Sequence, residues 1–237
     1  FDSARLDCGV GGLRATYIYI DHVNRILGPN SNWNSDSHML NVSYGIAPAL
    51  KVEVFVYALD FTTSPINNSI TDGVKASGKI VHGPFSLAYN AAYANQRNYR
   101  GAPMPNFNLG YDEGDVAASY DIYTAKVGYE VLDGNGVRGF TTPLATTHAF
   151  NGWADAWVSP GANKSFVDGI KDLSFAGIVR PKLKLPYLFN PEFTAVYHDF
   201  NNERTGAALA DEIDLQAVAS VTSKLTVTLK YADFTRR

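Results

Sequence analysis

The sequence alternates between pairs of strand-like segments and long polar stretches, and this rhythm constrains the fold more than any single motif. One pair contains LNVSY at 40–44 and VEVFV at 52–56, and another contains IDLQA at 213–217 and LTVTLKY at 225–231. Side chains on a strand alternate between two faces, so each segment offers one apolar and one polar face. Short turns within pairs and long loops between pairs are typical of a transmembrane β-barrel.

The alternation and the turn residues together predict about twelve strands. We therefore predict an all-β fold, an antiparallel up-and-down transmembrane β-barrel, with residues 1–237 forming a single domain. A soluble β-sandwich would mix hairpins with crossovers of irregular length, and the sequence shows no such pattern. The predicted pairs are 4–10 with 13–26, 39–47 with 51–61, 73–82 with 85–96, 115–121 with 123–132, 170–180 with 192–200, and 211–221 with 225–234.

Composition narrows the class of protein further. Charged residues make up 18% of the chain and tyrosine occurs 14 times, a bias that suits membrane interfaces as well as β-rich cores. The net charge of −3 gives no reason to expect nucleic acid as a partner. Cys8 is the only cysteine, so no internal disulfide can form, and we expect no metal and no cofactor. The sequence has no run of apolar residues long enough for a membrane-spanning helix.

The rhythm also predicts an orientation in the outer membrane of a Gram-negative cell, with the short turns in the periplasm and the long loops outside. The first strand then begins, and the last strand finishes, on the extracellular side. Bacterial barrels ordinarily keep both termini in the periplasm. One further strand at each end, or any odd number, would correct this. We therefore expect the chain to be part of a larger barrel of roughly 14 to 18 strands.

The two strand faces can be assigned from the alternation. Positions predicted to face lipid are Val42, Tyr44, Val54, Val56, Leu87, Tyr89, Val127, Tyr129, Leu215, Ala217, Val227 and Leu229. Positions predicted to line the pore are Lys75, Lys79, Lys126, Glu130, Arg180, Asp214 and Lys230. Their signs are mixed, so paired charges on neighbouring strands are the ordinary expectation. Five of the seven are cations, and four of these, Lys75, Lys79, Lys126 and Arg180, hint at a basic stretch that would suit an anionic solute.

The longest connection, at 133–169, is too long to be only a connector. Its tryptophans at 153 and 157 are four residues apart, which would place them on one face of a short helix. They could anchor the loop against the barrel wall, or stack on sugar rings that enter the mouth. We expect this extracellular loop to fold into the barrel mouth and control access; the alternatives are a lid over the rim and a contact with a neighbouring barrel. The residues predicted to form the constriction are Arg138, His148, Trp153, Asp155 and Trp157.

The same region resembles a known family. The runs GYEVLDGNG at 128–136 and FTTPLATTHAFNGWAD at 140–155 resemble the alginate-export family of Gram-negative outer-membrane β-barrels, with further matches at 21–25, 195–200 and 229–233. The resemblance implies a porin-like channel that passes small solutes, an oligosaccharide or a polysaccharide. Alginate itself is not carried over as the cargo, because membership of a family fixes the barrel better than its substrate.

Other functions are weaker candidates. The five histidines are scattered without the spacing of a metalloprotease motif, and the sequence has no nucleophile elbow, so we expect no enzyme. The DGNG run at 133–136 lacks the distal glutamate of a calcium loop and is predicted to be a turn. The competing hypothesis is a structural or assembling barrel with an occluded lumen. The expected partners are outer-membrane lipid and lipopolysaccharide, a solute or saccharide, and a second copy if the barrel forms homo-oligomers.

Overall fold

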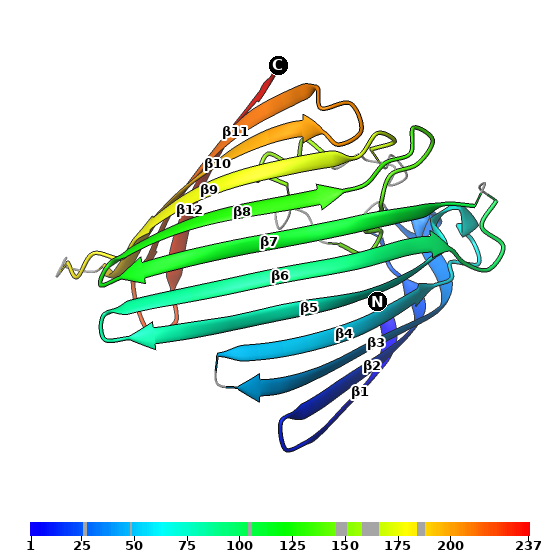
Figure 1. Cartoon of the computed structure of the whole chain (residues 1–237), viewed down its shortest axis with the longest axis horizontal. Coiled ribbons are helices and arrows are strands. Elements are labelled where there is room, and N and C mark those ends of the chain that lie inside the picture. Colours follow the sequence, from blue (N-terminus) through cyan, green and yellow to red (C-terminus); the bar gives the residue numbers. More distant parts are fainter. Residues whose placement is uncertain (26–27, 48, 104–105, 146–150, 158–165, 184–187) are drawn as a thin grey trace.

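The computed structural model is a single antiparallel sheet of twelve strands, which confirms the predicted fold class (Figure 1). It describes residues 1–25, 28–47, 49–103, 106–145, 151–157, 166–183 and 188–237. Within these residues no helix is long and apolar enough to cross a membrane. The strands are β1 (Asp2–Val10), β2 (Leu13–Val23), β3 (Trp33–Ala47), β4 (Leu50–Leu59), β5 (Ser69–His82), β6 (Phe85–Asn98), β7 (Asn108–Tyr120), β8 (Tyr123–Leu132), β9 (Ile170–Val179), β10 (Phe189–Asn202), β11 (Ala208–Ser220) and β12 (Thr226–Arg236).

Each strand pairs with its neighbours in sequence, so the sheet order is β1 to β12 without a crossover. The six predicted pairs are all present, and the short turns lie at one end of the sheet, which we call the turn end. At the first of these turns Gly11 has a φ of 57°, a left-handed conformation that favours glycine. The opposite end, the loop end, carries the other five connections, including the longest one at 133–169, whereas the connection between β9 and β10 at 180–188 is a longer one at the turn end.

Several strands extend further toward the loop end than predicted. β3 begins at Trp33 rather than at 39, β5 at Ser69 rather than at 73, and β7 at Asn108 rather than at 115. In β3 the added stretch reads WNSDSH, which is mostly polar at both odd and even positions. The alternation signal is therefore absent, although the backbone continues to pair: the Asp36 N–H donates to the Asp60 carbonyl oxygen at 2.8 Å.

The register places apolar side chains in rows on one face of the sheet. Val127 of β8 lies beside Val116 of β7 and Phe175 of β9, and these three side chains are exposed by 42%, 43% and 49%. Following the register from strand to strand puts all twelve positions predicted to face lipid on this same outer face. An apolar face of this extent is what a barrel wall presents to hydrocarbon.

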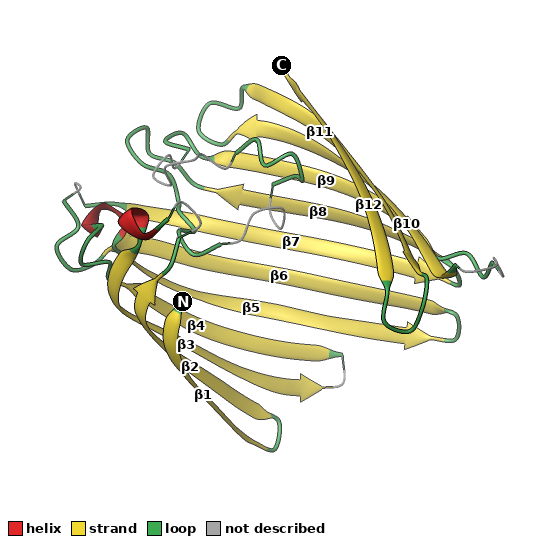
Figure 2. Ribbon diagram, turned by 180° about the vertical axis from the view of Figure 1, so that it is seen from behind, coloured by secondary structure: helices red, strands yellow, loops and turns green. Residues whose placement is uncertain are grey.

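The opposite face is concave, and the connections of the loop end fold over it (Figure 2). Buried apolar clusters lie at this end: one contains Trp33 and Phe61, and a second contains Ile170 and Phe200 packed with Trp157. β1 and β12 form the two edges of the sheet, and no described residues pair them with each other. The sheet is therefore an open portion of a barrel wall, as expected for part of a larger barrel.

The two faces should differ sharply in their tolerance of charge. Arginine at Val127 or Leu215 should cost about 2–4 kcal/mol of stability, because it places a cation in hydrocarbon near the bilayer midplane. Arginine at Gln216, which neighbours Leu215 but faces the concave side, should cost little. Urea unfolding of the complete protein in lipid vesicles measures the loss of stability for substitutions on each face. Equal losses at Leu215 and Gln216 would contradict the assignment of the faces.

Candidate functional site

The candidate site is the concave face of β7 to β12 together with the connection at 133–169. This connection begins with a small hairpin. The Phe140 N–H donates to the Asp133 carbonyl oxygen at 2.8 Å, and Asn135 Oδ1 accepts the N–H groups of Val137 and Arg138 at 2.9 and 2.8 Å. The DGNG run is therefore a turn, as predicted.

The two ends of the connection pack backbone against backbone. A Cβ atom at Gly139 would overlap the carbonyl oxygen of Phe166, and one at Gly134 would overlap the amide nitrogen of Gly169. The Gly136 N–H also donates to the Val167 carbonyl oxygen at 2.6 Å. Only glycine allows this approach, so the base of the connection is fixed at the rim of the concave face.

Residues 151–154 form a turn that binds carboxylates on the barrel wall. Asn151 and Gly152 have φ values of 53° and 87°, and two successive left-handed residues direct neighbouring backbone N–H groups toward one side. The Trp153 N–H donates to Asp214 Oδ2 at 3.2 Å, and the Ala154 N–H donates to Glu212 Oε1 at 2.7 Å. We call residues 151–154 the docking turn.

The wall beneath the docking turn is acidic. Asn151 Nδ2 donates to Glu130 Oε2 at 2.8 Å, and Glu130 Oε1 accepts the Tyr111 hydroxyl at 2.7 Å. His198 on β10 lies between two carboxylates, with Nδ1 2.9 Å from Asp172 and Nε2 3.6 Å from Asp214. β8, β9 and β11 therefore supply the carboxyl groups of this wall. The docking turn and His198 contact these carboxyl groups.

The two tryptophans of the connection have different surroundings. Trp157 packs edge-on against Phe166, Phe200 and Phe234, with ring centroids 5.0 to 5.2 Å apart, which fits the anchoring hypothesis. Trp153 lies over the inner wall, and its ring centroid is 4.6 Å from Lys230 Nζ. The predicted short helix is wrong: left-handed residues at 151, 152 and 155 interrupt it, so the spacing of the tryptophans does not reflect a helical face.

Arg138 lies elsewhere than expected. Its side chain is only 5% exposed; Nη1 donates to the Ile66 carbonyl oxygen at 2.9 Å, and the guanidinium lies 4.3 Å above the Phe107 ring. Burial lowers the pKa of this guanidinium. Arg138 thus joins three loop-end connections instead of facing a solute. Asp155 lies in the described segment next to the docking turn, and His148 lies outside the described residues.

Of the cations predicted to line the pore, Lys79, Lys126 and Arg180 lie nearer the turn end, Lys75 lies at the middle of β5, and Lys230 lies beside Trp153. Lys126 pairs with Asp115 at 3.3 Å, and Arg180 pairs with Glu192 at 2.6 Å. Lys75 and Lys79 make no ion pair within the described part of the chain. A hollow of about 510 Å³ beside Lys79 also brings together Arg14, Lys51, Ser43 and Ser77. Sequence reasoning did not select Arg14, because its strand is apolar on both faces and hides the alternation.

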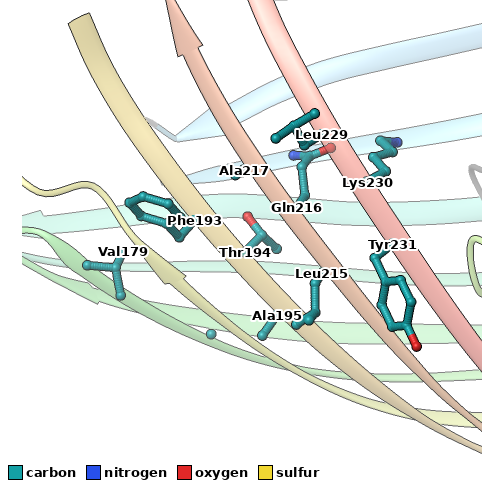
Figure 3. Close-up of a pocket in the computed structure, with 11 residues that line it drawn as sticks. Val179, Phe193, Thr194, Ala195, Leu215, Gln216, Ala217, Leu229, Lys230 and Tyr231 are labelled. Atoms are coloured by element: carbon teal, nitrogen blue, oxygen red, sulfur yellow. The ribbon is translucent and has the colours of Figure 1, made fainter. Parts of the chain in front are cut away.

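A second hollow, of about 450 Å³, is not part of this site (Figure 3). It is lined by Phe193, Leu215, Leu229 and Tyr231, whose positions in the register belong to the outer face, around the small side chain of Ala195. It is a depression in the apolar surface of the sheet.

The fold is similar to that of several solved outer-membrane proteins. Pseudomonas aeruginosa OccK10 (OpdN) matches with a TM-score of 0.73 and 15% identity, over 99% of this chain and 67% of that one. The outer membrane protein OprD from the same organism matches with a TM-score of 0.68 and 13% identity, over 98% of this chain and 62% of that one. Acinetobacter baumannii OccAB2 matches with a TM-score of 0.65 and 18% identity, over 98% of this chain and 61% of that one. The chain thus spans about two thirds of their length.

At these identities the likeness shows the fold alone. No family model matches the sequence, and no curated protein does. The resemblance to the alginate-export family therefore has no support from the comparisons, whereas the porin-like barrel architecture does.

The docking turn should depend on the glycine at 152. A Cβ there would collide with the carboxylate of Glu212, in addition to the strain of a left-handed alanine. Gly152→Ala should therefore expose the backbone amides of 151–157 to faster hydrogen exchange while the strands keep their protection. Gly206→Ala is a matched control, because Gly206 also has a left-handed φ of 71° and a Cβ added there would meet no atom within 4 Å. Equal effects of both substitutions on 151–157 would contradict the docking geometry.

Proposed function

We propose that the chain forms the greater part of an outer-membrane channel for passive diffusion of small solutes. The observation that carries this proposal is the division of the sheet into an apolar outer face and a charged concave face, with the docking turn fixed across the latter. In this proposal the turn end faces the periplasm and the loop end the cell exterior, with lipid and lipopolysaccharide around the outer face.

The docking turn favours small solutes over a polymer as cargo. Trp153 and the backbone of 151–154 lie on the inner wall of β8 and β11, where they occupy space that an open barrel would leave to water. The turn narrows the path at the loop end, and a constriction of this kind selects by size and charge.

The charge distribution favours an anionic solute at the turn end. The carboxyl groups near the loop end are engaged by the docking turn, by Tyr111 and by His198. Lys75 and Lys79 lie on the inner face of β5, and Arg14 and Lys51 share a hollow with Lys79. A solute with a carboxylate or phosphate group would meet these cations after it passes the constriction.

Planar-bilayer recording of the complete protein tests the channel. We expect discrete conductance steps, and Trp153→Ala should raise the conductance because it removes a large side chain from the inner wall while leaving the Trp153 N–H to bind Asp214. Tyr93→Ala, on the outer face, is the control of similar size. A folded protein that carries no current would favour the structural barrel with an occluded lumen.

The proposed anion preference has its own test. Replacing Lys75 and Lys79 by glutamine should shift the reversal potential in a salt gradient toward cation selectivity, because it removes two positive charges from the lumen. Lys182→Gln is the control, since the Lys182 side chain is 77% exposed beyond the end of β9 and pairs with Asp121. Selectivity unchanged by the double substitution would contradict an anionic cargo.

A further inference from the structure

The docking turn rests on two carboxyl groups that follow each other on the concave face of β11. Glu212 and Asp214 are both 0% exposed. One oxygen of each accepts a backbone N–H of the turn, at 2.7 Å for Glu212 Oε1 and 3.2 Å for Asp214 Oδ2. The other oxygen of each, Glu212 Oε2 and Asp214 Oδ1, is buried without a hydrogen-bond partner among the described residues.

These two unpartnered oxygens belong to neighbouring groups. Glu212 and Asp214 are two residues apart on the same face of β11, and the N–H groups of two consecutive residues, Trp153 and Ala154, bind one carboxylate each. Neither oxygen can donate when both carboxyl groups are ionised, and two adjacent buried negative charges repel. A single proton held between Glu212 and Asp214 would provide the missing hydrogen bond for both oxygens and remove one of the two charges. The remaining negative charge would still be stabilised by the two backbone N–H groups of the turn.

The charged groups on the neighbouring elements strengthen this requirement for a proton. Asp172 on β9 contacts His198 on β10, which in turn approaches Asp214 at 3.6 Å. A protonated His198 carries one positive charge, which offsets only one of the negative charges of Asp172, Glu212 and Asp214. Among the described residues, the ionisable groups that contact the pair or the docking turn are Glu130 on β8, His198 on β10 and Lys230 on β12. Asp172 on β9 contacts His198, and Asp155 follows the turn in the chain.

We propose that Glu212 and Asp214 share one proton and so form a pH-responsive latch that holds the docking turn across the lumen. Loss of the shared proton leaves two buried charges beneath the turn, and lifting the turn lets water solvate both of them. Docking is therefore favoured as the pH falls and weakens as the pH rises. The consequence for transport rests on the proposed channel function, whereas the latch itself is a property of the wall and the turn.

Hydrogen exchange tests the latch without any measurement of transport. Protection factors of the 151–157 amides, which remove the intrinsic pH dependence of exchange, are measured on the complete protein in detergent at roughly pH 6 and roughly pH 9. The wild type should lose protection at the higher pH by roughly tenfold or more, the factor for one hydrogen bond to a charged group. Unchanged protection would overturn the proposal.

Two substitutions separate the shared proton from other causes. Glu212→Gln places a non-titrating N–H donor where the proton would lie and keeps an oxygen for the Ala154 N–H, so protection should become independent of pH. Asp214→Asn should act in the same way and serves if the first variant fails to fold. A pH dependence that persists in both variants would assign the effect to His198 and overturn the proposal. Glu53→Gln, on the concave face of β4 and paired with Lys51 at 3.1 Å, is the control and should behave as the wild type does.

Conductance recorded on the same samples keeps the two ideas apart. If the wild type conducts, its conductance should rise between the lower and the higher pH, and Glu212→Gln should abolish the rise. If the wild type carries no current, the channel function fails, and the protection factors alone still decide whether the latch exists.

Discussion

Backbone hydrogen bonding between neighbouring strands is the constraint on which the rest of this structure depends. In hydrocarbon an unpaired N–H or C=O group costs several kcal/mol, so a sheet can cross a membrane only where its strands satisfy one another. In this chain β2 to β11 are each paired on both sides. The resulting register also decides which side chains share a face, because side chains alternate along a strand. Lys126 lies on the concave face, and its neighbour Val127 lies on the apolar outer face.

The two ends of the sheet serve different purposes. At the loop end, aromatic side chains from the connections and the strands form buried clusters, and the docking turn covers the acidic part of the wall. At the turn end the connections are short except for the one between β9 and β10, and the concave face carries cations beside a hollow. In the proposed channel the loop end would therefore select solutes by size and the turn end would select them by charge.

The strand pairs could be predicted from sequence because each depends on local signals, namely alternation and a short turn. The extensions of β3 and β5 could not, because polar residues on both faces of those stretches leave little alternation to detect. The extension of β7 does alternate, with Leu109 and Tyr111 on one face, although the predicted strand begins only at 115. The two faces of β2 could not be assigned from sequence, because the strand is apolar on both faces; the register of the structure assigns them from the neighbouring strand. Tyr17, for example, pairs with Leu40 on the outer face.

The site was harder to predict than the wall. The docking turn depends on left-handed backbone at Asn151 and Gly152 and on carboxylates from β8 and β11, which lie far away in sequence. An asparagine followed by glycine was the local signal available for the turn. The partners of the turn could not be predicted, because only the pairing of β8 to β11 in the folded sheet brings Glu130 and Glu212 to the same part of the concave face. The burial of Arg138 required knowledge of two other connections as well.

Arg138 has a consequence for how the outer surface of this protein can change. Its guanidinium contacts the connection between β4 and β5 through Ile66 and the connection between β6 and β7 through Phe107. Connections at the surface of a protein tolerate change in sequence and length better than the strands they join. Here three of them share one buried side chain, so an insertion in any of the three alters the packing of the others. A change of length or sequence in one of these connections should therefore be accompanied by changes in the other two.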